Sequence, residues 1–145
     1  SGVFLHRVLD CRHPLVRGFD DNFYSPHSRN TDVKIEDIKK HDNLVILTVS
    51  DEAGVHIIAN KNGRQFFVTG HLEYGCNTLA DEYFRDLKKG LNPSIPKNYF
   101  PNDDITKEPP FVWRSHANLL FSNWLNYYVY QQTPYDLKEL TDNYL

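Results

Sequence analysis

LVILTVSDEAGVHIIANKNGRQFFV, residues 44–68, contains three apolar runs separated by two short polar stretches. The runs Leu44 to Val49, Val55 to Ala59 and Gln65 to Val68 are rich in the β-branched and aromatic residues that strands favour. Each connection holds a glycine and turn-forming polar residues, so the pattern predicts a three-stranded antiparallel meander. Because the runs are continuous, we expect a sheet covered on both faces by helices.

Two helices are expected downstream of these strands. Thr78 is placed to cap the first, with Asp81 as its capping-box partner, and Gly90 supplies its end. The second, from about Ser115 to Tyr130, is apolar nearly all round and should be buried in a core or in an oligomer interface. Residues 91–110 include five prolines, which predicts a long extended loop. Residues 1–30 are rich in turn signals, and only short apolar pieces are expected there.

The length and composition indicate a single globular domain. The chain has 145 residues, of which 40% are hydrophobic and 24% charged, and its formal net charge is -3. That balance argues against a nucleic-acid partner, and no apolar run reaches the roughly 18 residues of a membrane span. The first residues lack the basic flank and long apolar region of a signal peptide, and with only two cysteines we expect a cytoplasmic protein. Cys11 and Cys76 form neither a disulfide framework nor a CxxC site, and we expect no metal.

The chemically informative stretch is FFVTGHLEY, residues 66–74. Residues two apart project to one side of an extended backbone, so His71 and Glu73 should point together where the strand ends, with Gly70 allowing a sharp turn. A carboxylate beside an imidazole fixes its tautomer and stabilises the imidazolium, as a general base requires. By itself this pair is more often an ordinary surface arrangement. Neither Cys11 nor Cys76 lies in a nucleophile elbow, and we interpret both as structural thiols.

Seven blocks of sequence, in order and with compatible spacing, make the chain similar to the homoserine O-acetyl/O-succinyltransferase family. The blocks are HPL (13–15), GFDD (18–21), PHSR (26–29), TGHLEY (69–74), EYFRDL (82–87), NYFPNDD (98–104) and WRSHANLLFSNWLNYYVYQ (113–131). The resemblance implies a glutamine-amidotransferase-like (flavodoxin-like) α/β three-layer sandwich about twice this length. Residues 1–145 would then be its C-terminal half, with antiparallel strands and a buried C-terminal helix.

The same resemblance implies a division of roles between two halves of the domain. His71 and Glu73 match the family's catalytic histidine and glutamate, while Ser28 and Arg85 match positions that contact the amino-acid substrate. Glu82 is expected to orient Arg85 through an i,i+3 pair. The family's nucleophilic cysteine and a substrate-binding lysine belong to the first half and have no counterpart here. Leu72 stands where the family commonly has proline, which could change the geometry between the two catalytic residues.

The implied reaction is acyl transfer from acetyl- or succinyl-CoA to the hydroxyl of L-homoserine in methionine biosynthesis. Acyl-CoA would be a co-substrate, and no cofactor is expected. We expect this chain alone to be inactive, because it supplies the base without the nucleophile, and to pair with the missing N-terminal half or form a homodimer. L-serine is an alternative acceptor. A non-catalytic amino-acid-binding paralogue is the main alternative, and glutamine amidotransfer on the same fold is a third.

Overall fold

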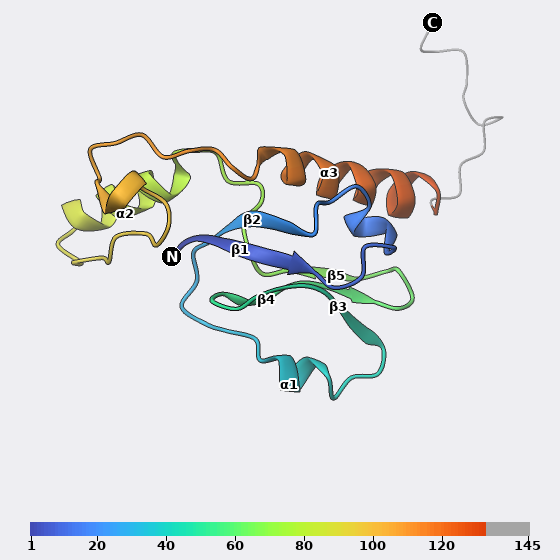
Figure 1. Ribbon diagram of the computed structural model, residues 1–145. Coiled ribbons are helices and arrows are strands. Elements are labelled where there is room, and N and C mark those ends of the chain that lie inside the picture. Colours follow the sequence, from blue (N-terminus) through green and yellow to red (C-terminus); the bar gives the residue numbers. More distant parts are fainter. Residues whose placement is uncertain (133–145) are drawn as a thin grey trace, which may run out of the picture.

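The computed structural model describes residues 1–132, which form one five-stranded antiparallel sheet with helices around it (Figure 1). The strand order in the sheet is β2-β1-β3-β4-β5. The elements in chain order are β1 (Gly2–Val8), η1 (Pro14–Val16), β2 (Asn22–His27), α1 (Ile35–Ile38), β3 (Leu44–Ser50), β4 (Gly54–Asn60), β5 (Phe66–Val68), α2 (Thr78–Lys88), η2 (Pro101–Asp103), α3 (Arg114–Trp124) and η3 (Leu125–Tyr130). The α/β class, the antiparallel strands and the C-terminal helix are thus confirmed.

The predicted meander is present as β3, β4 and β5. Gly54 has a φ of +71° in the turn that joins the first two of these strands, a conformation that glycine adopts without steric cost. All residues of β4 after Gly54 are buried, so this strand is covered on both faces as expected. β5 is only three residues long and lies at one end of the sheet order.

The first 30 residues hold two strands that the turn-rich pattern did not predict. β1 and β2 pair antiparallel, with Val3 opposite Pro26 and His6 opposite Phe23. Pro26 is tolerated because β2 lies at the other end of the sheet order, where a missing backbone N–H breaks no inner ladder. The turn-forming residues do form turns, but these lie in the connection between the two strands and at the end of each.

Two apolar cores lie on opposite faces of the sheet. The larger contains Leu47, Ile57 and Trp113 and is covered by α3, which crosses the sheet in Figure 1. The smaller contains Ile38 of α1 together with Val55 and Ile58. The tertiary structure therefore places covering elements on both faces, as the continuous apolar runs predicted.

The two predicted helices are present, with differences at their ends. α2 begins at Thr78, but Asn77 is its N-cap residue and no side chain caps it, so the predicted capping box is not formed. α3 buries only one face, through Ala117, Leu120 and Asn123. The Asn123 amide anchors this helix by donating to the carbonyl oxygens of residues 15 and 17, at 3.1 and 2.8 Å. Among residues 1–132, no helix combines the length and apolar character that crossing a membrane requires.

Candidate active site

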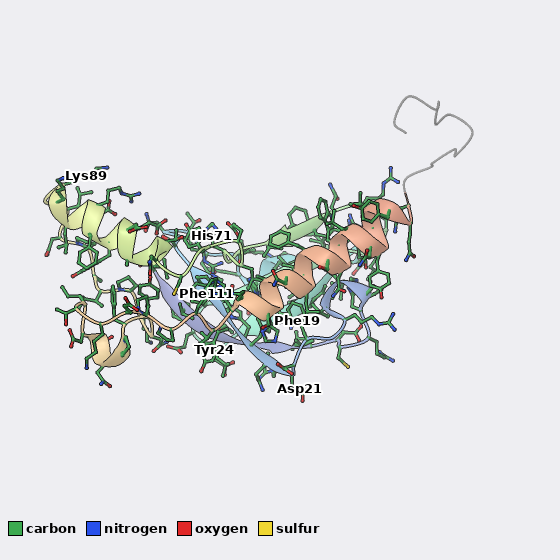
Figure 2. All side chains as sticks on the ribbon, turned by 90° about the horizontal axis from the view of Figure 1, so that it is seen from above. Phe19, Asp21, Tyr24, His71, Lys89 and Phe111 are labelled. Carbon is green, nitrogen blue, oxygen red and sulfur yellow. The ribbon has the colours of Figure 1, made fainter. Side chains whose placement is uncertain are left out.

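His71 and Glu73 meet in the loop after β5, as the sequence predicts. Nδ1 of His71 lies 2.8 Å from Oε1 of Glu73, and the two side chains are 33% and 57% exposed. Figure 2 shows His71 between α2 and α3. Leu72 is buried in the core and directs neither neighbour away, so leucine at this position is compatible with the pairing. Nδ1 is therefore held by a carboxylate, which leaves Nε2 as the ring nitrogen available to a substrate.

The loop is held by the backbone on both sides. The Thr69 N–H donates to the His56 carbonyl at 2.9 Å, and the His71 N–H donates to the Pro26 carbonyl at 2.7 Å. His56 belongs to β4 and Pro26 to β2, which are separated by two strands in the sheet order. The segment after β5 therefore reaches across to the far strand, with Thr69 bonded to β4 and His71 bonded to β2.

Tyr74 joins the His71–Glu73 pair to the residues predicted to contact the substrate. Its ring stacks on His71, with ring centroids 4.4 Å apart, and its hydroxyl donates to Oε1 of Glu82 at 2.8 Å. Burial, followed by the hydrogen bond to Glu82 and its charge, raises the pKa of Tyr74 to about 12. The phenol consequently stays a donor at neutral pH. The Trp113 indole N–H donates to the Tyr74 carbonyl at 2.9 Å and holds the residue in place.

Ser28, Glu82 and Arg85 line a polar cavity of about 420 Å³ beside this loop. Ser28 Oγ donates to Oε2 of Glu82 at 2.7 Å. The expectation that Glu82 orients Arg85 is wrong, because the Arg85 Nε instead donates to Oδ1 of Asp86 at 2.8 Å. That bond, followed by the charge of Asp86, raises the pKa of Arg85. The cavity thus contains a fixed carboxylate from Glu82 and a guanidinium that is 55% exposed.

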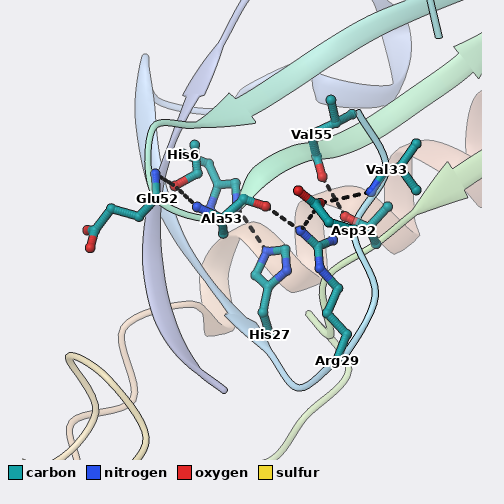
Figure 3. Close-up of polar contacts among 10 residues, drawn as sticks. His6, His27, Arg29, Asp32, Val33, Glu52, Ala53 and Val55 are labelled. Carbon is teal, nitrogen blue, oxygen red and sulfur yellow. Dashed lines mark hydrogen bonds and ion pairs between the residues drawn. The ribbon is translucent and has the colours of Figure 1, made fainter. Parts of the chain in front are cut away.

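Arg29, the neighbour of Ser28, binds other parts of the chain. Its Nη2 lies 3.0 Å from Oδ1 of Asp32 and also donates to the Ala53 carbonyl in the β3–β4 turn (Figure 3). These bonds attach the segment after β2 to that turn. Arg29 also lines the polar cavity, but its guanidinium is engaged in holding the backbone.

Neither cysteine of the chain is arranged as a nucleophile. Cys76 Sγ donates to the Pro109 carbonyl at 3.2 Å, and burial raises the pKa of this thiol, which suits a structural role. Cys11 is exposed, so burial gives no support to its interpretation as a structural thiol. Within residues 1–132, no group of His, Cys, Asp and Glu side chains has the arrangement of a metal site.

Residues 1–135 match the family model described as homoserine O-succinyltransferase. The chain belongs to this family. A homoserine O-acetyltransferase of Acetivibrio thermocellus is 61% identical over 96% of this chain and 46% of its own length. A homoserine O-succinyltransferase of Shewanella pealeana is 54% identical over 97% of this chain and 45% of its own length. The chain therefore spans about half the length of the curated relatives it matches.

A solved structure shares the fold of this chain without close sequence similarity. The crystal structure of SMU.1228c is similar with a TM-score of 0.56 and 16% sequence identity, covering 84% of this chain and 49% of that chain. At this identity the likeness concerns the fold alone. It shows that the same arrangement of elements occurs as half of a larger chain.

Sequence reasoning and structure agree on which residues meet, but the sequence did not reveal how they connect. His71 and Glu73 are together, and Ser28 and Arg85 share one cavity although 57 positions (85 - 28) separate them. The missed residue is Tyr74, which lay inside the quoted motif. Its only local signal was an aromatic ring directly after the His-x-Glu pair, which is too common a feature to indicate a bridge.

Proposed function

We propose that this chain is the base-carrying and amino-acid-binding half of an acyltransferase that transfers an acyl group from acyl-CoA to L-homoserine. The observation that carries the proposal is the 2.8 Å contact between His71 Nδ1 and Glu73 Oε1 beside the Ser28–Glu82–Arg85 cavity. A paired base next to a cavity with both charge signs suits a zwitterionic amino acid whose hydroxyl must be deprotonated. Membership of the homoserine O-succinyltransferase family supports this acceptor.

The chemistry proceeds in two displacements, with the nucleophile supplied by the other half of the domain. A cysteine thiolate attacks the thioester carbonyl, and the CoA thiolate leaves to give a thioester-linked acyl-enzyme. The homoserine hydroxyl then attacks the acyl carbon while His71 Nε2 takes its proton, and the cysteine thiolate leaves. Glu73 stabilises the imidazolium through Nδ1, as the third member of a triad does. The ester product would serve methionine biosynthesis.

The cavity residues account for recognition of the amino-acid end of the acceptor. A guanidinium grips a carboxylate with two parallel hydrogen bonds, so Arg85 is assigned to the α-carboxylate. The Glu82 carboxylate, already oriented by Ser28 and Tyr74, is assigned to the α-ammonium group. Tyr74 contacts both Glu82 and the His71 ring, so it connects the residue assigned to the ammonium group with the base.

The surface on the other side of His71 suits the half that would carry the nucleophile. An apolar trough, defined here as Val68, Leu120, Phe121 and Trp124, runs between β5 and α3. A cavity of about 430 Å³ continues it to His71 and Glu73. β5 pairs with β4 alone among the described residues, and its Phe67 and Val68 are 46% and 40% exposed. An apolar edge strand of this kind invites another strand, and one docked there would lie next to the base.

The decisive assay measures CoA release and acyl-ester formation with acetyl-CoA or succinyl-CoA and with L-homoserine or L-serine. It compares this chain alone with the complete enzyme, meaning the full-length protein that carries the chain or its fusion to the other half of the Acetivibrio thermocellus relative. We expect turnover from the complete enzyme only, and a loss of about 10³-fold or more in the His71→Ala variant.

Two outcomes would contradict the proposal. Undiminished turnover in His71→Ala would remove the histidine from the chemistry. Binding of L-homoserine without any acyl transfer in the complete enzyme would instead identify a non-catalytic amino-acid-binding protein. A preference for L-serine would retain the mechanism and change the acceptor.

A further inference from the structure

A layer of buried polar side chains lies beneath the loop that carries His71. This histidine layer is defined as His6, Ser25, His27, Thr48 and His56, none of which is more than 3% exposed. Its members come from β1, β2, β3 and β4, so it fills the inside of the curve that brings the end of β5 across to β2. Buried polar groups require hydrogen-bond partners, and here these come from within the layer and from nearby backbone groups. Within the described residues, His27 Nδ1 is the one ring nitrogen of the layer without a partner.

Gly70 closes the layer from above. A Cβ atom at this position would lie 2.8 Å from each of three atoms, His27 Nε2, His56 Nε2 and Ser25 Oγ. Real Cβ atoms do not approach neighbours this closely, and all three atoms belong to buried side chains with no free space to move into. Gly70 has no left-handed φ, so the glycine is required by space and not by backbone conformation.

The hydrogen bonds of His6 and His27 determine which of their ring nitrogens carry a hydrogen. His6 Nδ1 lies 2.9 Å from the Phe4 carbonyl, which can only accept, so Nδ1 carries the hydrogen. Its Nε2 is then the acceptor for the His27 Nε2–H at 3.0 Å (Figure 3). Burial lowers the pKa of His6 to about 4 and that of His27 to about 3, which agrees with two neutral rings.

A second chain of hydrogen bonds leads from β4 to the backbone of His71. Each group can donate to the next, over distances of 3.1, 3.3, 3.2 and 3.4 Å, in the order Ile57 N–H, Thr48 Oγ1, His56, Ser25 Oγ and the Pro26 carbonyl. Burial lowers the pKa of His56 as well, so its ring is neutral, with one donor and one acceptor. The Pro26 carbonyl is the same oxygen that accepts the His71 N–H at 2.7 Å.

We propose that Ser25, His56 and Gly70 are positioning residues for acyl transfer, which rests on the function proposed above. The layer determines how closely Gly70 packs on the sheet and how the Pro26 carbonyl is oriented. Together, the packing of Gly70 and the hydrogen bond to Pro26 determine where the His71 backbone lies. His71 Nε2 then faces the acceptor hydroxyl while Nδ1 stays on Glu73. A displacement of about 1 Å at a reacting group can reduce a rate by about 10²-fold. Small shifts in this layer should therefore lower the rate of acyl transfer.

The first test replaces Gly70 by alanine in the complete enzyme, with Gly75→Ala as the matched control. A Cβ at Gly75 would meet only Thr78 Oγ1, at 3.6 Å, which is ordinary contact. We expect Gly70→Ala to lower kcat at least tenfold while KM for L-homoserine stays within twofold, because the substrate cavity is not touched. Gly75→Ala should retain both constants. Thermal unfolding of each variant at the assay temperature gives the folded fraction by which kcat is corrected.

The second test keeps the volume of the layer and changes only its hydrogen bonds. His56→Leu removes the donor and the acceptor, whereas His56→Gln retains one of each. We expect kcat per folded enzyme to fall at least fivefold in the leucine variant and to remain within twofold in the glutamine variant. A role in filling space alone would make the two variants equal. This pair decides the matter even where Gly70→Ala fails to fold.

The two proposals fail in different ways. An inactive wild-type complete enzyme overturns both the acyltransferase function and the positioning that depends on it. An active wild type with full kcat in Gly70→Ala and in both His56 variants overturns the positioning alone. Equal losses in His56→Leu and His56→Gln also overturn it, whatever the behaviour of Gly70→Ala.

Discussion

The two sides of the loop after β5 differ in how complete they are within this chain. On the polar side, Ser28, Tyr74 and Glu82 are joined by hydrogen bonds of 2.7 and 2.8 Å. On the apolar side, Phe121 and Trp124 of α3 are 44% and 42% exposed beside a strand edge. His71 stands between the two sides, stacked on Tyr74 and lining the cavity that continues the apolar trough.

The difference has a physical reason. A buried polar group without a partner costs free energy at once, so a recognition site made of polar side chains has to be satisfied within the unit that folds. An apolar surface can be covered later by association, and its burial then contributes to assembly. The polar side is therefore built by this chain, and the apolar side is where the proposed N-terminal half would dock.

The largest effect should come from breaking the apolar side with Phe121→Asp. Docking would bury an unpaired carboxylate at a cost of several kcal/mol, so the affinity between this chain and the other half should fall about 10²-fold or more. Native mass spectrometry of the two halves expressed separately measures it. Leu91→Asp, at a residue that is 65% exposed and outside the trough, is the control and should assemble normally. Unchanged affinity in Phe121→Asp would mean that the partner binds elsewhere.

A smaller effect should follow from breaking the polar side with Arg85→Ala. Loss of a charged hydrogen-bonding partner for the α-carboxylate costs about 1.5–3 kcal/mol, so KM for L-homoserine should rise roughly 10–100-fold with little change in kcat. Assembly with the other half should not change, which separates the two sides. Arg12→Ala, on a side chain that is 90% exposed, is the matched control. An unchanged KM would remove Arg85 from substrate binding.

Acid should lower the stability of the folded protein through the buried histidines beneath the loop. The pKa of His6 is about 4 and that of His27 about 3 in the folded protein, against 6.5 for an ordinary histidine. Below pH 6.5 the unfolded chain therefore binds protons that the folded chain does not, and stability falls as the pH drops toward 4. Each histidine contributes at most about 1.4 kcal/mol per pH unit.

The measurement is thermal unfolding of the complete enzyme between pH 7 and 4. His56→Gln removes one of the buried histidines and should make the decline in unfolding temperature shallower. Burial lowers the pKa of His56 in the same direction, so its loss is expected to act in that sense. An equally steep decline in the variant would show that the acid sensitivity arises outside the histidine layer.

Local patterns were sufficient for the meander, for α2 and for the His71–Glu73 contact. Strands and helices signal themselves by apolar period, and residues two apart in an extended segment share a side whatever surrounds them. The same local view misassigned residues 1–30, where the pairing of β1 with β2 outweighs the turn signals between them. It also paired Glu82 with Arg85 by helical spacing, although Ser28 and Tyr74 hold that carboxylate from other elements.

The amino-acid sequence alone thus determined the class of fold, the contact between His71 and Glu73 and the family resemblance, because each is encoded within a short stretch or in the order of such stretches. Tertiary structure decided the rest. The histidine layer draws residues from four strands, and the cavity brings Ser28, which directly follows β2, together with Arg85 of α2. Contacts between residues so far apart depend on the curvature of the sheet and on close packing, and no periodicity in the chain records either.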